Sequence, residues 1–397
     1  MAKLFRRGWF PLLALLVLAF NLRPVAVSVG PVLVEITRDA NLGPIEAGLL
    51  TSLPTLSFAV FGAVAPALAR RFGDHAVIAA SLVALIAGQL FRAAATTPWA
   101  FLGFSTLALA GMALANVLLP GLVRIHFPNR VGLVTALYSF VLTIGVTLAG
   151  AITVPMAEAL GGWRAAFTAG ASIAVAALIT WLPLWFTVRQ RPQRNQQNAA
   201  HTMAAVARTK LGWAMALFFG IQSAQAYSIF GWLPSVYRSA GLSSVDAGYM
   251  LGLATGIGII PALLIPAYVA RARRPQILLL ALVTFLVIGY AGLLVNPAQL
   301  SWLWATLLAL GTAMFPMILA LLGIRARTPS ATAALSGFTQ SVGYLIAIAG
   351  PLSFGTLQAL TGDWTASLVL QLVLIIPQTG FGLYALRDQV IEDQLAS

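Results

Sequence analysis

The 397-residue sequence contains no cysteine and only ten aspartates and glutamates. The lack of cysteine excludes disulfide frameworks, thiolate zinc sites and cysteine nucleophiles. Charged residues make up 8% of the chain, while 60% of its residues are hydrophobic. A soluble domain carries roughly a quarter charged residues, so this composition is typical of a protein built for a lipid bilayer.

Long apolar runs fill most of the sequence. Each run is continuous over about 20 residues, the length that an α-helix needs to cross ~30 Å of hydrocarbon, and none alternates as a membrane β-strand does. The sequence therefore predicts an all-α membrane protein with twelve transmembrane helices. The expected spans are 9–36, 46–69, 76–94, 99–123, 131–157, 164–187, 211–237, 246–270, 276–295, 300–323, 331–357 and 365–386.

Lysines and arginines gather in alternate connections between these spans. Eighteen fall on the side that holds both termini, and four, Arg38, Arg92, Arg164 and Arg238, fall on the other. By the positive-inside rule, both termini are expected in the cytoplasm, with the chain crossing a bacterial-type inner membrane. This distribution also accounts for the net charge of +13. A nucleic-acid partner is not expected, because it would need basic residues gathered on one soluble face.

The two halves of the sequence resemble each other with a period near 200 residues. Arg38 aligns with Arg238, and Pro66-Ala67 aligns with Pro266-Ala267. Parallel repeats of six spans are typical of secondary transporters, whose site lies near the bilayer midplane. The expected domains are an N-terminal six-helix bundle, a cytoplasmic linker, and a C-terminal six-helix bundle with a short cytoplasmic tail, over residues 1–188, 189–210 and 211–397.

This arrangement resembles the major facilitator superfamily, and one motif narrows the resemblance. The stretch "FNLRPVAVSVGPVL", residues 20–33, is similar to the N-x-R-P…S-V-G-P-L signature of the cyanate and nitroimidazole transporter family within that superfamily. The resemblance implies cyanate, nitroimidazole-like compounds or small carboxylates as the substrate class. One superfamily motif departs from its usual form: "PALARRFGDH" has Pro66 and Arg70 where the pattern G-x-x-x-D-R-x-G-R-R has Gly and Asp.

Arg23 is the one ionisable residue expected near the middle of a span, since all carboxylates and histidines fall in loops, span ends or the tail. It lies about 14 residues from Trp9, or ~21 Å along a helix. An arginine at such depth costs at least ~2.5 to 3.5 kcal/mol and normally faces a bundle interior or a cavity. We interpret Arg23 as the charge that pairs with a small anion in a central cavity. The alternative is a structural arginine that donates to carbonyls near Pro24 or to amides of a neighbouring span.

Other polar and aromatic residues are candidates for the same cavity. On the seventh span, Gln222, Gln225 and Trp232 share one helix face. The two amides either contact a ligand or join neighbouring helices, and the sequence leaves both open. For Phe338, core packing is the simpler interpretation. The remaining candidates for substrate binding are Asn21, Asn116, Tyr138, Phe338, Gln340 and Tyr344.

Together these features predict a monomeric secondary transporter that moves a small anion or polar planar solute by alternating access, without a cofactor or metal. If a proton is cotransported, either Glu35 at the outer end of the first span or the substrate itself is expected to titrate; otherwise the protein is expected to be a uniporter or an anion exchanger. An enzyme is disfavoured, because the span interiors hold no His, Cys, Asp or Glu for a nucleophile–base pair or a metal site. The alternatives are a drug or metabolite efflux pump of the same fold and a non-transporting membrane receptor.

Overall fold

The computed structural model describes residues 9–187 and 203–395, and every regular element among them is helical. Helices suit lipid because each one pairs its own backbone N–H and C=O groups. The elements of the N-terminal half are α2 Trp9–Asn21, α3 Pro24–Val27, the 3-10 turn η1 Gly30–Val32, α4 Leu33–Asp39, α5 Pro44–Ser57, the π-helical turn η2 Phe58–Gly62, α6 Ala63–Phe72, α7 Asp74–Ala94, α8 Pro98–His126, α9 Val131–Leu160 and α10 Trp163–Thr187. Those of the C-terminal half are α11 Met203–Val206, α12 Lys210–Ser239, α13 Ser244–Gly256, α14 Ile259–Arg271, α15 Pro275–Val295, α16 Ser301–Thr312, α17 Met314–Ile324, α18 Pro329–Ala347, α19 Ala349–Thr361, α20 Thr365–Ala385 and α21 Ile391–Leu395.

The first expected span, 9–36, is not one continuous helix. It is divided into α2, α3, η1 and α4, with breaks before Pro24 and around Pro31. Proline has no backbone N–H, and its ring crowds the carbonyl one turn earlier, so the regular ladder stops at both positions. Arg23 occupies the first break, where its carbonyl accepts hydrogen bonds from the N–H groups of Ala26 at 3.0 Å and Val27 at 3.2 Å.

Serine and threonine side chains cap several of the long helices. The hydroxyl of Thr209 accepts a hydrogen bond from the Gly212 N–H at 3.1 Å at the start of α12. Ser243 accepts from the Asp246 N–H at 3.0 Å at the start of α13, which satisfies one donor that the first helical turn leaves free. These caps explain why α12 and α13 begin where they do.

The twelve expected spans are recovered as single helices or as helices with a break. Eleven of them, within the described residues, are long and apolar enough to cross a membrane. The remaining one is α12, which has 30 residues but carries more polar groups and is buried along most of its length. Three later spans are also broken, between α13 and α14, α16 and α17, and α18 and α19.

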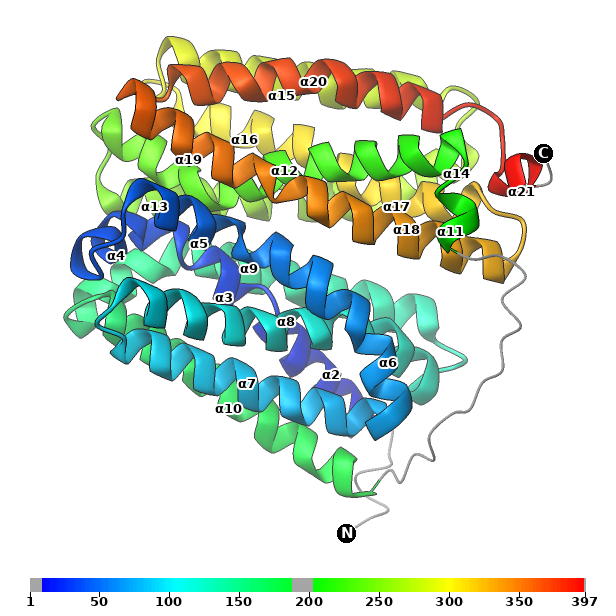
Figure 1. Cartoon of the computed structure of the whole chain (residues 1–397), viewed down its shortest axis with the longest axis horizontal. Coiled ribbons are helices and arrows are strands. Elements are labelled where there is room, and N and C mark those ends of the chain that lie inside the picture. The colour runs from blue at the N-terminus through cyan, green and yellow to red at the C-terminus, as the bar shows by residue number, and fades with distance from the viewer. Residues whose placement is uncertain (1–8, 188–202, 396–397) are drawn as a thin grey trace.

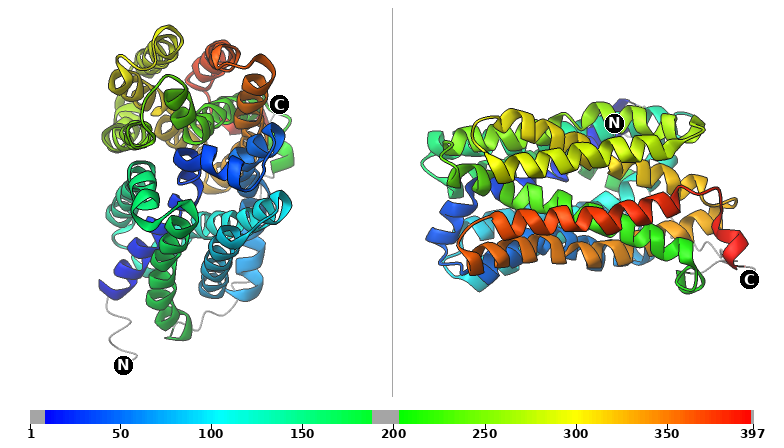
Figure 2. Two further views of the ribbon diagram at one scale, coloured as in Figure 1. Left: turned by 90° about the vertical axis from the view of Figure 1, so that its left-hand side faces the viewer. Right: turned by 90° about the horizontal axis from the view of Figure 1, so that it is seen from above.

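The helices form two bundles that lie side by side, one from each half of the sequence (Figures 1 and 2). We call the end where α10 stops and α12 starts the linker end, and the opposite end, where α4 and α9 stop, the far end. The halves touch where α5 packs on α19 and α9 packs on α13. At the second contact the backbones meet closely, since a Cβ on Gly150 would lie 2.9 Å from the backbone nitrogen of Gly252.

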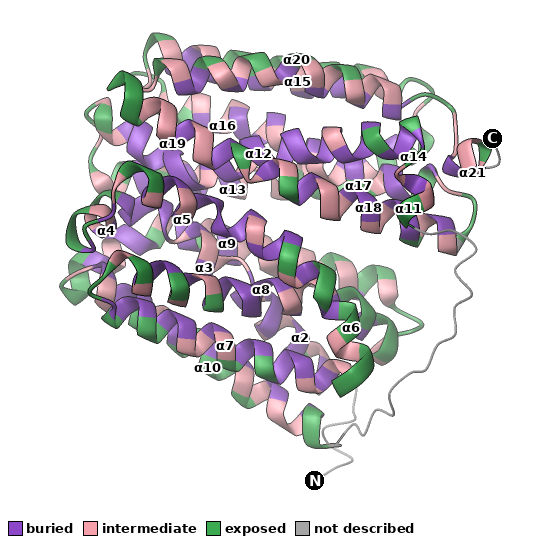
Figure 3. Cartoon of the chain, viewed as in Figure 1, coloured by how far each residue is buried: buried purple, intermediate pink, exposed green. Residues whose placement is uncertain are grey.

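The outer surface of both bundles is apolar. Figure 3 shows buried residues between the helices and exposed residues on the outside and at the ends. Large hydrophobic side chains are among the most exposed, including Phe186 at 76%, Ile376 at 73% and Ile260 at 66%. A soluble protein rarely exposes apolar patches of this extent, so the surface fits a hydrocarbon surrounding.

Candidate functional site

The side chain of Arg23 reaches from the break in the first span toward the boundary between the two halves. Its guanidinium carbon lies 5.8 Å from the centre of the Phe58 ring. Its Nε is buried without a hydrogen-bond partner, and the side chain forms no ion pair or hydrogen bond with any described residue. The residue as a whole is only half-buried. The structural alternative, an arginine satisfied by nearby carbonyls or amides, therefore has no contact to support it.

Three aromatic side chains lie near Arg23 and a fourth packs on one of them, and we call the four the aromatic cluster: Phe58, Tyr227, Tyr344 and, packed on Tyr344, Phe219. Phe58 and Tyr344 stack across the two halves, with ring centres 4.9 Å apart and planes 16° from parallel. Phe219 meets Tyr344 edge to face at 5.0 Å. The charge of Arg23 interacts with both Tyr227 and Tyr344. The Tyr227 hydroxyl is buried and has no hydrogen-bond partner among the described residues.

Local backbone geometry places these side chains. Phe58 opens η2, a five-residue π-helical turn inside the second span, and such turns are frequent at functional sites. Tyr227 comes from the centre of α12, and Tyr344 lies near the end of α18, just before the break at Ile348. The side chains of the aromatic cluster therefore come from segments next to a helix interruption or from α12, the buried helix of the C-terminal half.

A second arginine supports the segment that carries Arg23. Arg92 was expected at the end of a span among the few basic residues of the far side, but it is wholly buried at 0% exposure. One of its terminal nitrogens donates to the Val25 carbonyl at 3.3 Å, and its guanidinium lies 4.2 Å from the centre of the Phe167 ring. It faces inward because the broken first span offers a free carbonyl and α10 offers an aromatic face. Arg92 therefore holds α3 in place.

The far end of the inter-half boundary is closed. Arg238 at the end of α12 forms a two-pronged ion pair with Glu35 of α4, with nitrogen–oxygen distances of 2.9 and 2.8 Å. Next to this pair, the backbone of Gly30 packs so tightly on the Phe230 carbonyl that a Cβ would come within 2.1 Å of its oxygen. Between this closure and Arg23, Tyr227 and Phe230 help to enclose a cavity of about 10 Å³, room for one water at most.

The glutamines of the seventh span do not lie beside Arg23. The amide nitrogen of Gln222 donates to the Thr312 carbonyl at 3.0 Å, and that of Gln225 donates to the Gln371 carbonyl at 3.1 Å. The indole N–H of Trp232 donates to the Pro351 carbonyl at 2.9 Å. All three acceptors belong to the C-terminal half, so in this conformation these side chains join helices, the second of the two roles left open.

The other candidates are dispersed. Asn21 is buried and donates to the carbonyls of Val17 at 2.9 Å and Ile173 at 3.1 Å, inside the N-terminal half. Phe338 meets the Trp213 ring edge to face at 5.4 Å, which fits the core-packing interpretation. Gln340 donates to the Ser336 hydroxyl at 2.8 Å. Tyr138 and Asn116 are half-buried on α9 and α8. Of the predicted binding residues, the structure brings together Arg23 and Tyr344.

Sequence reasoning missed Phe58, Phe219, Tyr227 and Arg92. Tyr227 is two residues after Gln225, which places it on nearly the opposite face of α12. Helical spacing separated the two faces correctly, but α12 is buried on both. Because both faces of α12 are buried, the sequence did not show which of them meets the N-terminal half.

No metal centre is evident. The described residues contain no group of three or more His, Asp or Glu side chains that could hold an ion. Both histidines of the described residues, His75 and His126, face each other at the linker end with their Nε2 atoms 3.3 Å apart. His201, the third histidine, lies outside the described residues.

Comparison with known proteins identifies the family. The family model described as Major Facilitator Superfamily matches residues 12–351. The chain belongs to the Major Facilitator Superfamily. It is 35% identical over 379 residues to the 2-nitroimidazole transporter of Escherichia coli (strain K12), covering 95% of each chain. It is 29% identical over 354 residues to the cyanate transport protein CynX of the same organism, covering 89% of this chain and 91% of that protein. The predicted resemblance to this family is thus confirmed.

Solved structures agree on the fold of this superfamily member. A bacterial homologue of the human lysosomal transporter Spinster superposes with a TM-score of 0.77 at 16% sequence identity, covering 94% of this chain and 96% of that chain. Identity this low supports the architecture alone. The all-α fold of two parallel bundles expected from the repeat is confirmed.

Proposed function

We propose that this protein is a secondary transporter that moves a small anion or a polar planar solute, in the class of cyanate, nitroimidazoles and small carboxylates. The single observation that carries the proposal is Arg23, a guanidinium between the two halves without a carboxylate or hydrogen-bond partner among the described residues. An arginine at this depth is stabilised when an anion supplies the missing partner. The names of the two relatives above agree with that class.

The aromatic cluster adds selectivity for flat solutes to the positive charge of Arg23. A planar anion can accept two parallel hydrogen bonds from a guanidinium, because both groups are flat. The Phe58 and Tyr344 rings stack on each other next to it, and we expect a flat solute to stack on the outer face of this pair. The free Tyr227 hydroxyl supplies one more hydrogen bond. Charge, flat faces and one hydroxyl together favour a small conjugated anion over a bulky or cationic solute.

Alternating access follows from the two-bundle architecture. The halves are held together at the far end by Glu35 and Arg238 and by the Gly30 contact. Opening toward the far end requires that this ion pair separate. With both termini in the cytoplasm of a bacterial inner membrane, the far end faces outward, and the Glu35 carboxylate is the group placed to take up a proton as the pair opens.

Uptake into proteoliposomes tests the proposal. Wild type, Arg23→Lys and Arg23→Ala are compared over cyanate, 2-nitroimidazole and benzoate, with and without a proton gradient. Arg124→Ala removes an exposed arginine at the linker end and serves as a matched control. Arg23→Ala is expected to lower uptake of the transported solute at least about tenfold, because the loss of a charge-assisted pair exceeds ~1.4 kcal/mol. Arg23→Lys is expected to retain part of it.

Uptake by both Arg23 variants equal to wild type, at equal insertion, would show that Arg23 does not bind the solute. Specific binding without any flux would favour the receptor alternative. A flux that is insensitive to the proton gradient in wild type would remove proton coupling, and with it the proposed role of Glu35.

A further inference from the structure

A second hollow lies away from Arg23, at the linker end of the C-terminal half. It is a pocket of about 630 Å³ between the start of α12 and the end of α20. Figure 1 shows this part of α12 between α18 and α20 on the side of the molecule. Lys210 and Trp213 line it from α12, and Pro377, Phe381 and Tyr384 line it from α20.

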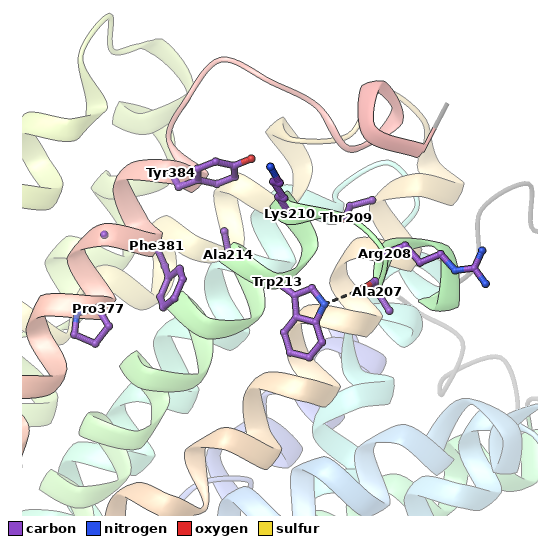
Figure 4. A pocket seen from close by; sticks show the side chains of 10 residues that line it. Ala207, Arg208, Thr209, Lys210, Trp213, Ala214, Pro377, Phe381 and Tyr384 are labelled. Atoms are coloured by element: carbon purple, nitrogen blue, oxygen red, sulfur yellow. Dashed lines mark hydrogen bonds between the residues drawn. The ribbon is translucent and has the colours of Figure 1, made fainter. Parts of the chain in front are cut away.

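The pocket is polar at one end and apolar at the other. Figure 4 shows the tips of Lys210 and Tyr384 together at one end, with the ring of Phe381, Pro377 and the indole of Trp213 below them. From Tyr384 back to Pro377 is seven residues, or about 10 Å along α20 toward the bundle interior. This order, polar near the helix ends and apolar deeper, matches the order of groups in a phospholipid.

The polar end carries positive charge. Besides Lys210 and Arg208, which line the pocket, the guanidinium of Arg387 lies 5.1 Å from the centre of the Tyr384 ring. No carboxylate lines the pocket, and Asp388, next in sequence to Arg387, lies 3.8 Å from Arg325 instead. Within the described chain, neither Lys210 nor Arg208 forms an ion pair.

Two backbone N–H groups near the start of α12 already have hydrogen-bond partners. The Leu211 N–H donates to the Gln394 side chain at 3.0 Å, and the Gly212 N–H donates to the Thr209 hydroxyl at 3.1 Å. We therefore expect the cationic side chains and Tyr384 to make the main contacts with an anion in the pocket.

We propose that this pocket binds an anionic phospholipid from the leaflet at the linker end. The phosphate lies between Lys210 and the Tyr384 hydroxyl, and one acyl chain runs along Phe381, Pro377 and the indole of Trp213. Basic pockets between transmembrane helices are suited to acidic headgroups. The chain's own segment 188–202 is a poor occupant on charge grounds, because its sequence has three arginines and no acidic residue.

Native mass spectrometry of the full-length protein tests this assignment. Detergent-purified protein is mixed with equal amounts of phosphatidylglycerol and phosphatidylcholine, and the retained lipid is counted. The headgroup variant is Lys210→Gln with Arg387→Gln. The chain variant is Gly380→Leu, which adds a side chain inside the pocket at a glycine whose Cβ would meet no atom within 4 Å, so the fold tolerates it.

The matched control is Arg273→Gln with Arg274→Gln, which removes two exposed charges at the same end but outside the pocket. Wild type and control are expected to retain phosphatidylglycerol in preference to phosphatidylcholine. The headgroup variant is expected to lose about tenfold or more of that retention, and the chain variant a similar amount.

Three results would overturn the proposal. Equal loss in the control would indicate a diffuse basic surface, and equal retention of the two lipids would indicate a non-selective apolar groove. Displacement of the lipid by millimolar inorganic phosphate, with unchanged binding in Gly380→Leu, would make the ligand a free phosphate instead.

Discussion

Replacing Glu35 by glutamine tests whether the ion pair at the far end holds the two halves together. The carboxylate and the Arg238 guanidinium make two contacts of 2.9 and 2.8 Å, and their side chains are 30% and 21% exposed. Two unit charges 4 Å apart attract by about 4 kcal/mol at an effective dielectric constant near 20. Desolvation and side-chain ordering offset most of this, which leaves on the order of 1 to 2 kcal/mol for closure.

That free energy sets the expected effect. Glu35→Gln should raise the population open at the far end about 5- to 30-fold, since ~1.4 kcal/mol corresponds to a factor of ten. The chain has no cysteine, so a single introduced thiol can report on this opening without background. Val29 is suitable because it is 6% exposed and lines the small cavity with Tyr227 and Phe230.

The assay is the rate at which Val29→Cys reacts with a membrane-impermeant maleimide added from the far side of sealed vesicles. Glu35→Gln and Arg238→Gln should each accelerate labelling, and the exchange Glu35→Arg with Arg238→Glu should restore a slow rate. Labelling that is unchanged in both single variants would refute the reasoning. So would a charge exchange that leaves labelling as fast as in the single variants.

Three further predictions concern other contacts. Tyr344→Leu removes the ring stacked on Phe58, so the half-saturating concentration of planar solutes should rise about threefold to tenfold while that of non-planar anions changes little, measured by concentration-dependent uptake. Arg92→Met should keep or raise the melting temperature, because it removes a buried charge with unpaired nitrogens, yet lower solute affinity by freeing the segment of Arg23. A fall in melting temperature that accompanies the fall in solute affinity would contradict a role of Arg92 in positioning the segment of Arg23. Burial alone would raise the pKa of Glu392, but N–H donors, including those of Arg327 and Thr328 at 2.9 Å each, hold that pKa below its ordinary value. The stabilisation is therefore present above the unfolded pKa near ~4.3 and lost as pH falls through the folded one, so protease cleavage at α21 should increase at low pH in wild type and become independent of pH in Glu392→Gln.

The composition of the sequence and the period of its repeat were sufficient to predict the fold. Apolar runs of span length gave the helices, and the repeat that pairs Arg38 with Arg238 gave two parallel bundles. The breaks of the first span at Pro24 and Pro31 can also be read from the sequence, because the loss of a backbone donor is a property of the residue itself.

The candidate site was only partly predictable, for a physical reason. Arg23 was recognisable because a lone charge deep in a span has few explanations. Which face of the seventh helix meets it was not, since burial on both sides of α12 makes Gln225 and Tyr227 equally plausible. Arg92 does lie at the end of its span, in the last turn of α7, but its burial was not predicted, because the carbonyl to which it donates belongs to a break in another helix.

The glycine contact between α9 and α13 has a consequence for how the two bundles move. At Gly150 and Gly252 the two backbones approach closely, and the small Ala151 methyl group packs against the second glycine. Interlocked side chains resist displacement, because each must leave its socket before the next position is reached. A contact made of backbone and small side chains interlocks less deeply, so one bundle can tilt against the other there while the two stay in contact. The polar contacts at the edge of the boundary, such as Glu35 with Arg238, then provide most of the resistance to tilting. The tilt can therefore be regulated at these contacts while the packing of α9 on α13 stays unchanged.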